Sequence, residues 1–202
     1  MRGCQLQLIE KIPMPGYSSK SIEEIIQKYL KMYIPSHLEN PSAVDTDELW
    51  KAIYNSHKYK MCLVEKHDDP SIEAQVNFWS KEIQITEEFM RKLEDGDERS
   101  KFTLAHEISH VIFHSSYIMS NLQQAARAMT SRPQNIETYE SSEWQAEHSA
   151  GALLMPACTF VQYYKSLKQN NYSYMEIVES IVVTFGVSNS AAESRIRALE
   201  RQ

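Results

Sequence analysis

Residues 106–110 have the sequence HEISH, in which two histidines stand four positions apart with a glutamate after the first. Side chains at positions i and i+4 of a helix lie on one face, so the imidazoles of His106 and His110 can bind one metal ion. Zinc suits this pair because it accepts neutral imidazole nitrogen and tolerates an open coordination position. Glu107 is rotated by about 100° from His106 around the helix. Its carboxylate can therefore take a proton from an attacking water and pass it to a leaving amine.

Five residues with three fixed positions also occur by chance, in helices whose histidines are merely polar. The surrounding residues favour a buried helix, because apolar side chains occupy several of its sides: Phe102, Ala105, Ile108, Ile112 and Phe113. Buried polar groups need partners. A metal ion supplies one partner for both histidines and the glutamate, so the context raises the prediction of a zinc site.

A catalytic zinc usually has three protein ligands. The metzincin pattern would place a third histidine at position 116, which is Ser116, and would have a glycine where Phe113 stands. His114 lies about 12 Å along the helix axis from His106, too far for the three histidines to share one ion. We therefore expect His114 to pack near the site or to support a ligand rather than to bind the metal.

The remaining source of a ligand is a second helix that begins near residue 143. Five residues follow the spacing i, i+3, i+4, i+7 and i+11 and form one stripe: Glu143, Ala146, Glu147, Ala150 and Leu154. The small residues would let this helix approach the first one closely. One acid could bind zinc while the other accepts a hydrogen bond from a ligand histidine. Alternatively, both acids are exposed and are favoured by the helix dipole.

The segments FTLAHEISHVIFH (102–114) and ExxAxxxAxxLLMP (143–156) together resemble the ImmA/IrrE-type metallopeptidase family. The resemblance implies a minimal thermolysin-like zincin core, with Zn²⁺ held in a gluzincin-like manner by His106, His110 and Glu143. It implies that Glu107 is catalytic and that Glu147 supports a histidine. In two places the chain departs from the family pattern, with Glu147 in place of Asn or Asp and Ser149 in place of Phe. The implied function is a regulatory endopeptidase of bacteria or their mobile elements that cleaves a repressor-type, helix-turn-helix protein.

Hydrophobic periodicity and turn residues predict the elements that position these residues. Helices are expected at 21–34, 46–54, 99–113, 118–128, 143–155, 174–185 and 190–199, and strands at 59–66, 74–79 and 81–86. Thr46 and Ser142 are expected N-caps, and Gly186 an expected helix end. The predicted fold is α+β, with a small, mainly antiparallel sheet, helices packed on it and a C-terminal helical pair. We expect an N-terminal arm (1–17), a metallopeptidase core (18–160) and a helical extension packed on the core (161–202).

The composition bounds the remaining classes. The chain has 202 residues, 24% of them charged, and a net charge of −6, which argues against direct nucleic-acid binding. Arg195, Arg197 and Arg201 could touch phosphate, but glutamates are interspersed among them, so packing of the last helices is favoured. The first residues contain no continuous apolar stretch of the length expected for a signal peptide, no apolar run approaches membrane-spanning length, and the three cysteines are widely spaced. We expect a cytoplasmic protein with a protein partner and no membrane partner.

Two other functions stay open at this point: a non-catalytic zinc-containing module that binds a partner, and a DNA-binding regulator that uses the C-terminal helices. An intact Glu107 argues against the first, because a structural metal site does not need that acid. Three residues are candidates for stabilising an oxyanion by their type and neighbourhood alone: Tyr117, Tyr139 and His148.

Overall fold

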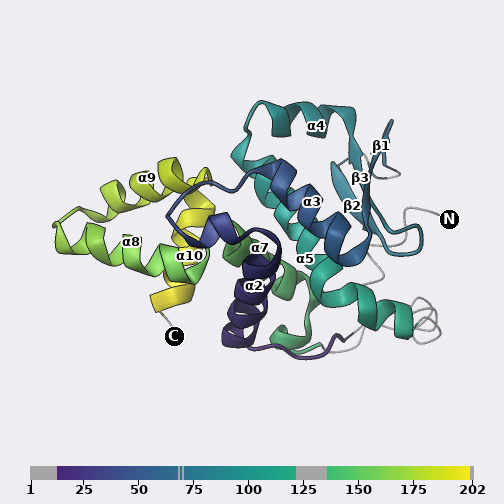
Figure 1. Cartoon of the computed structure of the whole chain (residues 1–202), viewed down its shortest axis with the longest axis horizontal. Coiled ribbons are helices and arrows are strands. Elements are labelled where there is room, and N and C mark those ends of the chain that lie inside the picture. Colours follow the sequence, from purple (N-terminus) through teal and green to yellow (C-terminus); the bar gives the residue numbers. More distant parts are fainter. Residues whose placement is uncertain (1–12, 68, 70, 122–135, 201–202) are drawn as a thin grey trace.

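The structure is a computed structural model that describes residues 13–67, 69, 71–121 and 136–200 (Figure 1). The helices are α2 (Ser19–Tyr33), α3 (Thr46–His57), α4 (Glu87–Glu94), α5 (Glu98–Ser120), α7 (Ser142–Leu154), α8 (Ala157–Gln169), α9 (Tyr174–Phe185) and α10 (Asn189–Glu200). Two short 3₁₀ helices are η1 (Pro35–Leu38) and η2 (Thr138–Glu140), and three strands are β1 (Lys60–Val64), β2 (Ala74–Asn77) and β3 (Glu82–Thr86). The α+β prediction is confirmed.

The three strands form one sheet in the order β1-β3-β2. β2 and β3 form an antiparallel hairpin in which Ala74 lies opposite Ile85. β3 then runs in the same direction as β1 and pairs with it in parallel, with Lys60 opposite Glu82. The sheet is therefore mixed rather than mainly antiparallel. The chain reverses direction twice after β1, and β3 rather than β2 lies beside β1, so one of the two strand pairs is parallel.

Most helices begin at a residue whose side chain accepts a hydrogen bond from the first turn, as capping requires. Asp45 caps α3 and Ser141 caps α7, so the predicted caps Thr46 and Ser142 are each one residue too late. Ser173 caps α9 within a capping box, and Gly186 ends this helix in the left-handed conformation, as predicted. The two ends of α9 are thus set by residues next to them in the sequence.

The central helix is longer than expected. α5 continues without interruption to Ser120, whereas separate helices were predicted at 99–113 and 118–128. Ser115 is buried and Ile118 packs in the core, so the buried face of the helix continues past residue 113. The rest of the predicted 118–128 helix lies outside the described residues.

α5 and α7 lie side by side at the centre of the molecule, and α5 also packs against β2 (Figure 1). α7 presents Ala146 and Ala150, both fully buried, which allows the close approach that the stripe of small residues predicted. On α5, Leu104, Ile108 and Val111 are fully buried in the same core. The two helices that carry the sequence motifs are thereby held together by packing over their length.

The C-terminal part contains three helices, α8, α9 and α10, instead of the predicted pair (Figure 1). α8 and α9 lie against each other, and α10 contacts α9 and α7. The expected boundary at residue 160 falls within α8, and the division of the chain into an arm, a core and an extension stays a prediction. Among the residues that the structure describes, no helix has the length and apolar character needed to cross a membrane.

Candidate metal centre

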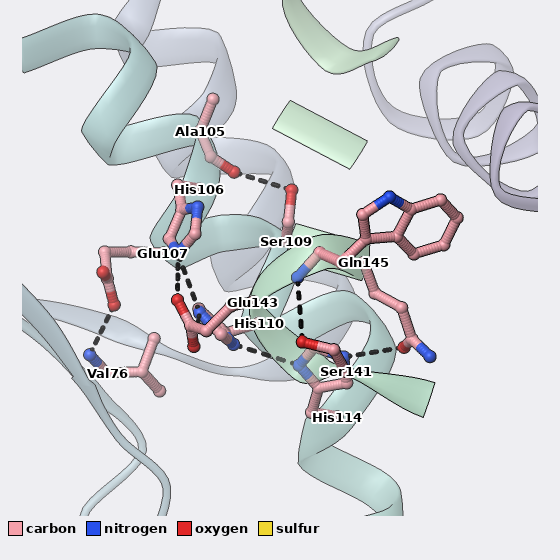
Figure 2. A network of polar contacts seen from close by, with 11 residues as sticks. Val76, Ala105, His106, Glu107, Ser109, His110, His114, Ser141, Glu143 and Gln145 are labelled. Atoms are coloured by element: carbon pink, nitrogen blue, oxygen red, sulfur yellow. Dashed lines mark hydrogen bonds and ion pairs between the residues drawn. The ribbon is translucent and has the colours of Figure 1, made fainter. Parts of the chain in front are cut away.

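His106, His110 and Glu143 come together where α5 passes the first turn of α7 (Figure 2). The two Nε2 atoms of the histidines lie 3.0 Å apart. Glu143 reaches both of them, with Oε2 at 3.2 Å from His106 Nε2 and Oε1 at 3.3 Å from His110 Nε2. No other group of histidine, cysteine, aspartate and glutamate side chains in the described part of the chain converges in this way.

These separations match what a tetrahedral metal ion demands of its ligands. Zinc binds imidazole nitrogen at about 2.0–2.1 Å and carboxylate oxygen at similar distances, so neighbouring ligand atoms lie about 3.3 Å apart. The three distances of 3.0, 3.2 and 3.3 Å agree with this value. In addition, Glu143 Oε1 is buried and accepts no hydrogen bond from any described group. Two nitrogen ligands and one oxygen ligand thus fit a zinc ion that keeps its fourth position open.

The electrostatic surroundings favour a bound cation. Burial, together with the charges of His114 and His106, lowers the pKa of His110 well below its usual range, so that its imidazole is neutral. Burial also lowers the pKa of His106, but the hydrogen bond to Glu143 and the charges of Glu107, Glu143 and Glu147 outweigh burial and raise it. Three carboxylates therefore surround His106, and a metal ion would neutralise much of their charge.

Glu107 is buried beside the ligands rather than among them. Its Oε2 accepts a hydrogen bond of 2.8 Å from the amide N–H of Val76 on β2, which holds the carboxylate against the sheet (Figure 2). Burial raises the pKa of Glu107 to about 7, with His106, Glu143 and the Val76 N–H as smaller influences. Within the described part of the chain no hydrogen bond is made to Oε1, so this oxygen is the one that can accept a proton.

His114 lies one turn beyond His110 and contacts it directly. The Nδ1 atoms of the two rings are 3.0 Å apart. On its other side, His114 Nε2 lies 3.0 Å from the Oε1 of Gln145 on α7. Gln145 was not identified from the sequence because it stands off the acidic stripe. The sequence gives no signal for it beyond a polar residue type next to Ala146 of the stripe.

Glu147 is exposed, unlike Glu143. Within the described ranges it makes no hydrogen bond or ion pair, and it acts on His106 only through its charge. It lines a cavity of about 600 Å³ between α5, α7 and α10, together with Phe102, Thr103, Trp144, Ser194 and Arg197. Of the oxyanion candidates, His148 stacks on Trp144 at this cavity, whereas Tyr139 on η2 is half exposed. Among the described residues, Glu147 thus makes no hydrogen bond to a histidine, although such a bond was predicted.

Comparison with known proteins places the site in a family. The sequence profile of a peptidase family, described as the IrrE N-terminal-like domain, matches residues 92–197, slightly more than half of the chain. No curated protein matches the chain. Among solved structures, a Mycobacterium tuberculosis transcriptional regulator is similar with a TM-score of 0.52 and 15% identity. The likeness covers 85% of this chain and 55% of that one, and at this identity it shows the fold alone.

Proposed function

The chain belongs to the family of IrrE N-terminal-like peptidase domains, and on that premise we propose that it is a zinc-dependent endopeptidase. The observation that carries the proposal is the convergence of the three ligand atoms of His106, His110 and Glu143 at 3.0–3.3 Å. Two imidazoles, one carboxylate and an open fourth position are the ligand set of catalytic zinc in hydrolases.

When bound, zinc supplies the Lewis acidity that polarises the scissile carbonyl and makes water more acidic. The chain supplies the proton transfers. Glu107 accepts a proton from the water that attacks the carbonyl carbon and returns it to the amide nitrogen as the C–N bond breaks. The hydrogen bond from Val76 N–H fixes one oxygen of this carboxylate and leaves the other for the proton.

For the substrate, we propose a repressor-type protein with a DNA-binding domain. The resemblance of residues 102–114 and 143–156 to the ImmA/IrrE-type family supports this class. The cavity between α5, α7 and α10 adjoins the helix turns that carry the ligands, and it offers a recess for side chains of such a protein. A protein substrate agrees with the acidic net charge of the chain.

Direct DNA binding through α9 and α10 is disfavoured by the position of Arg195. Its guanidinium donates to Glu23 on α2 and to the carbonyl oxygen of Met155, and its side chain is 2% exposed. A guanidinium in this position cannot reach a phosphate. Arg197 is exposed but pairs with Glu193, and Arg201 lies outside the described residues.

The test compares wild-type protein with Glu107→Gln. Glutamine has nearly the same shape but cannot take up the proton, so the variant should fold and retain about one zinc per chain. Cleavage of a helix-turn-helix repressor encoded beside the gene should fall by about 10²–10⁴-fold. The measurements are cleavage followed by gel and zinc content of the same preparations.

Glu94→Gln is the matched control, since Glu94 is exposed on α4 and should have no effect. A Glu107→Gln protein that cleaves like wild type would rule out Glu107 as the base. If neither wild-type protein nor Glu107→Gln cleaves any candidate repressor while both bind it, the function is that of a non-catalytic zinc module rather than the proposed enzyme.

A further inference from the structure

Gln145 forms the far end of a row of hydrogen bonds that begins at the metal centre (Figure 2). The row runs from His110 Nδ1 to His114 Nδ1 at 3.0 Å, and from His114 Nε2 to Gln145 Oε1 at 3.0 Å. All three side chains are fully buried. Gln145 Nε2 then donates to two main-chain carbonyl oxygens, those of Pro15 at 2.9 Å and Tyr139 at 2.7 Å.

The two carbonyls fix the direction of every bond in the row. Carbonyl oxygens only accept hydrogen bonds, so the amide nitrogen of Gln145 must face them. A flipped amide would bring its oxygen against two other oxygens in a buried place, which costs free energy. The amide oxygen of Gln145 therefore faces His114 and makes Nε2 of that ring the donor.

The same logic passes through the next two rings. A neutral imidazole carries one N–H and one lone pair. With its hydrogen on Nε2, His114 presents a lone pair at Nδ1, and His110 must donate from its own Nδ1. The lone pair of His110 is then on Nε2, the atom that lies 3.3 Å from Glu143 Oε1 and 3.0 Å from His106 Nε2.

We infer that Gln145 is a positioning residue, which fixes the tautomer of His110 through His114 and couples an N-terminal segment to the metal centre. We name residues 13–17 the N-terminal strap. The inference rests on the proposed function in one respect, that His110 binds the metal through Nε2. Outer partners of metal-bound histidines are usually carboxylates, carbonyls or waters. Here the partner is a second imidazole, that of His114, whose orientation is set by Gln145 outside the HEISH motif.

The strap is held against η2 by contacts other than Gln145. Met14 N–H donates to Glu140 O at 3.0 Å, and Tyr17 N–H donates to Tyr139 O at 3.2 Å. A side chain on Gly16 would place a carbon 2.6 Å from the ring of Tyr139, so the strap approaches η2 as closely as glycine allows. Tyr17 also packs edge-on against Phe113 of α5 at 5.4 Å between ring centroids. The carbonyl of Pro15 is thus kept in place for Gln145.

The first test reads the tautomers directly. Long-range ¹H–¹⁵N correlation spectra of ¹⁵N-histidine-labelled protein distinguish hydrogen on Nδ1 from hydrogen on Nε2. We expect His114 to carry its hydrogen on Nε2 and His110 on Nδ1, both in metal-free and in zinc-loaded wild-type protein. Hydrogen on Nδ1 of His114 in the wild-type protein would overturn the inference.

The second test removes the amide. Gln145→Met keeps the length of the side chain but makes none of the three hydrogen bonds, so both rings should show mixed tautomers in the metal-free protein. The zinc Kd should rise by about 10–100-fold, the usual effect of losing an outer partner. Gln84→Met is the matched control and should leave both readings unchanged, since among the described residues the side chain of Gln84 on β3 hydrogen-bonds only to Gln75 and Glu82.

If Gln145 had a merely structural role, Gln145→Met would lower stability without changing the tautomers. A Gln145→Met protein with the same histidine tautomers and the same zinc Kd as wild type would therefore overturn the inference. If Gln145→Met does not fold, the wild-type spectra decide alone. If wild-type protein binds no zinc, the proposed function fails, and the tautomers of the metal-free protein still decide this inference.

Discussion

At the scale of single residues, two acids on one helix face had to be told apart. Glu143 and Glu147 are four positions apart, and the helical spacing admits either as a ligand. The family resemblance selects Glu143, and the structure sets its two oxygens 3.2 and 3.3 Å from the histidine nitrogens. Glu147 stands one turn further along α7, is exposed and faces the cavity. Helical spacing defined the pair, the resemblance favoured Glu143, and the packing of α7 against α5 gives the two acids different surroundings.

Glu143→Gln should therefore weaken zinc binding more than Glu147→Gln. The first change replaces a charged ligand atom, and we expect a loss of more than about 100-fold, above the range seen for outer partners. The second removes only a nearby charge and should cost less than about 10-fold. Competition with a chromogenic chelator measures both Kd values, and the reverse order would make Glu147 the ligand.

At the scale of elements, the sequence predicted those with strong local signals. β2 and β3 alternate buried and half-buried residues, and α9 has both a capping box and a terminal glycine. α4 and α8 were not predicted, although Phe89 and Leu93 on α4 and Phe160 and Tyr164 on α8 have helical spacing. The sheet order also could not be predicted, because it depends on pairing between strands that are distant in the sequence.

The contacts of Arg195 hold α10 against its neighbouring elements. Arg195 on α10 and Glu23 on α2 form a buried ion pair, and Arg195 Nε donates to Met155 O at 2.9 Å. These contacts join α10 to α2 and to the end of α7. Arg195, a candidate phosphate contact by its sequence neighbourhood, is thus a packing residue. Loss of Arg195 is costly because the carboxylate of Glu23 is largely buried.

Arg195→Met should lower the free energy of unfolding by about 3–5 kcal/mol, because it leaves the largely buried carboxylate of Glu23 without its guanidinium partner. Arg197→Met is the control. Arg197 forms an exposed i, i+4 pair with Glu193, and its loss should cost no more than about 0.5 kcal/mol. Urea unfolding of the three proteins gives both values. Equal, small effects would show that the ion pair contributes nothing.

At the scale of the whole molecule, the candidate metal centre joins the two helices at the middle of the fold. His106 and His110 belong to α5 and Glu143 to α7, so a bound ion adds a cross-link between elements that already pack together. A ligand that binds only the folded state stabilises it in proportion to the logarithm of its concentration over Kd.

Chelation should therefore lower the melting temperature. With free zinc at 100 times Kd, binding contributes about 2.7 kcal/mol, and for a domain of about 200 residues each kcal/mol corresponds to about 2–4 °C. We expect EDTA to lower Tm by about 5–11 °C in wild-type protein and to have little effect on Glu143→Gln. Calorimetry with and without chelator makes the comparison, and an unchanged wild-type Tm would argue against a metal that binds only the folded chain.

The hydrogen bonds of Gln145 and Glu107 have a consequence for truncation. The family profile begins at residue 92, yet Pro15 and Val76 contribute main-chain atoms to the site. Because these atoms are shared by nearly all residue types, positions 15 and 76 can vary without loss of the bonds, and sequence comparison is blind to them. A fragment trimmed to residues 92–197 would retain the whole motif while leaving an amide hydrogen of Gln145 and the carboxylate of Glu107 without these partners. A domain boundary placed at the start of the family profile would thus remove main-chain hydrogen-bond partners of the site.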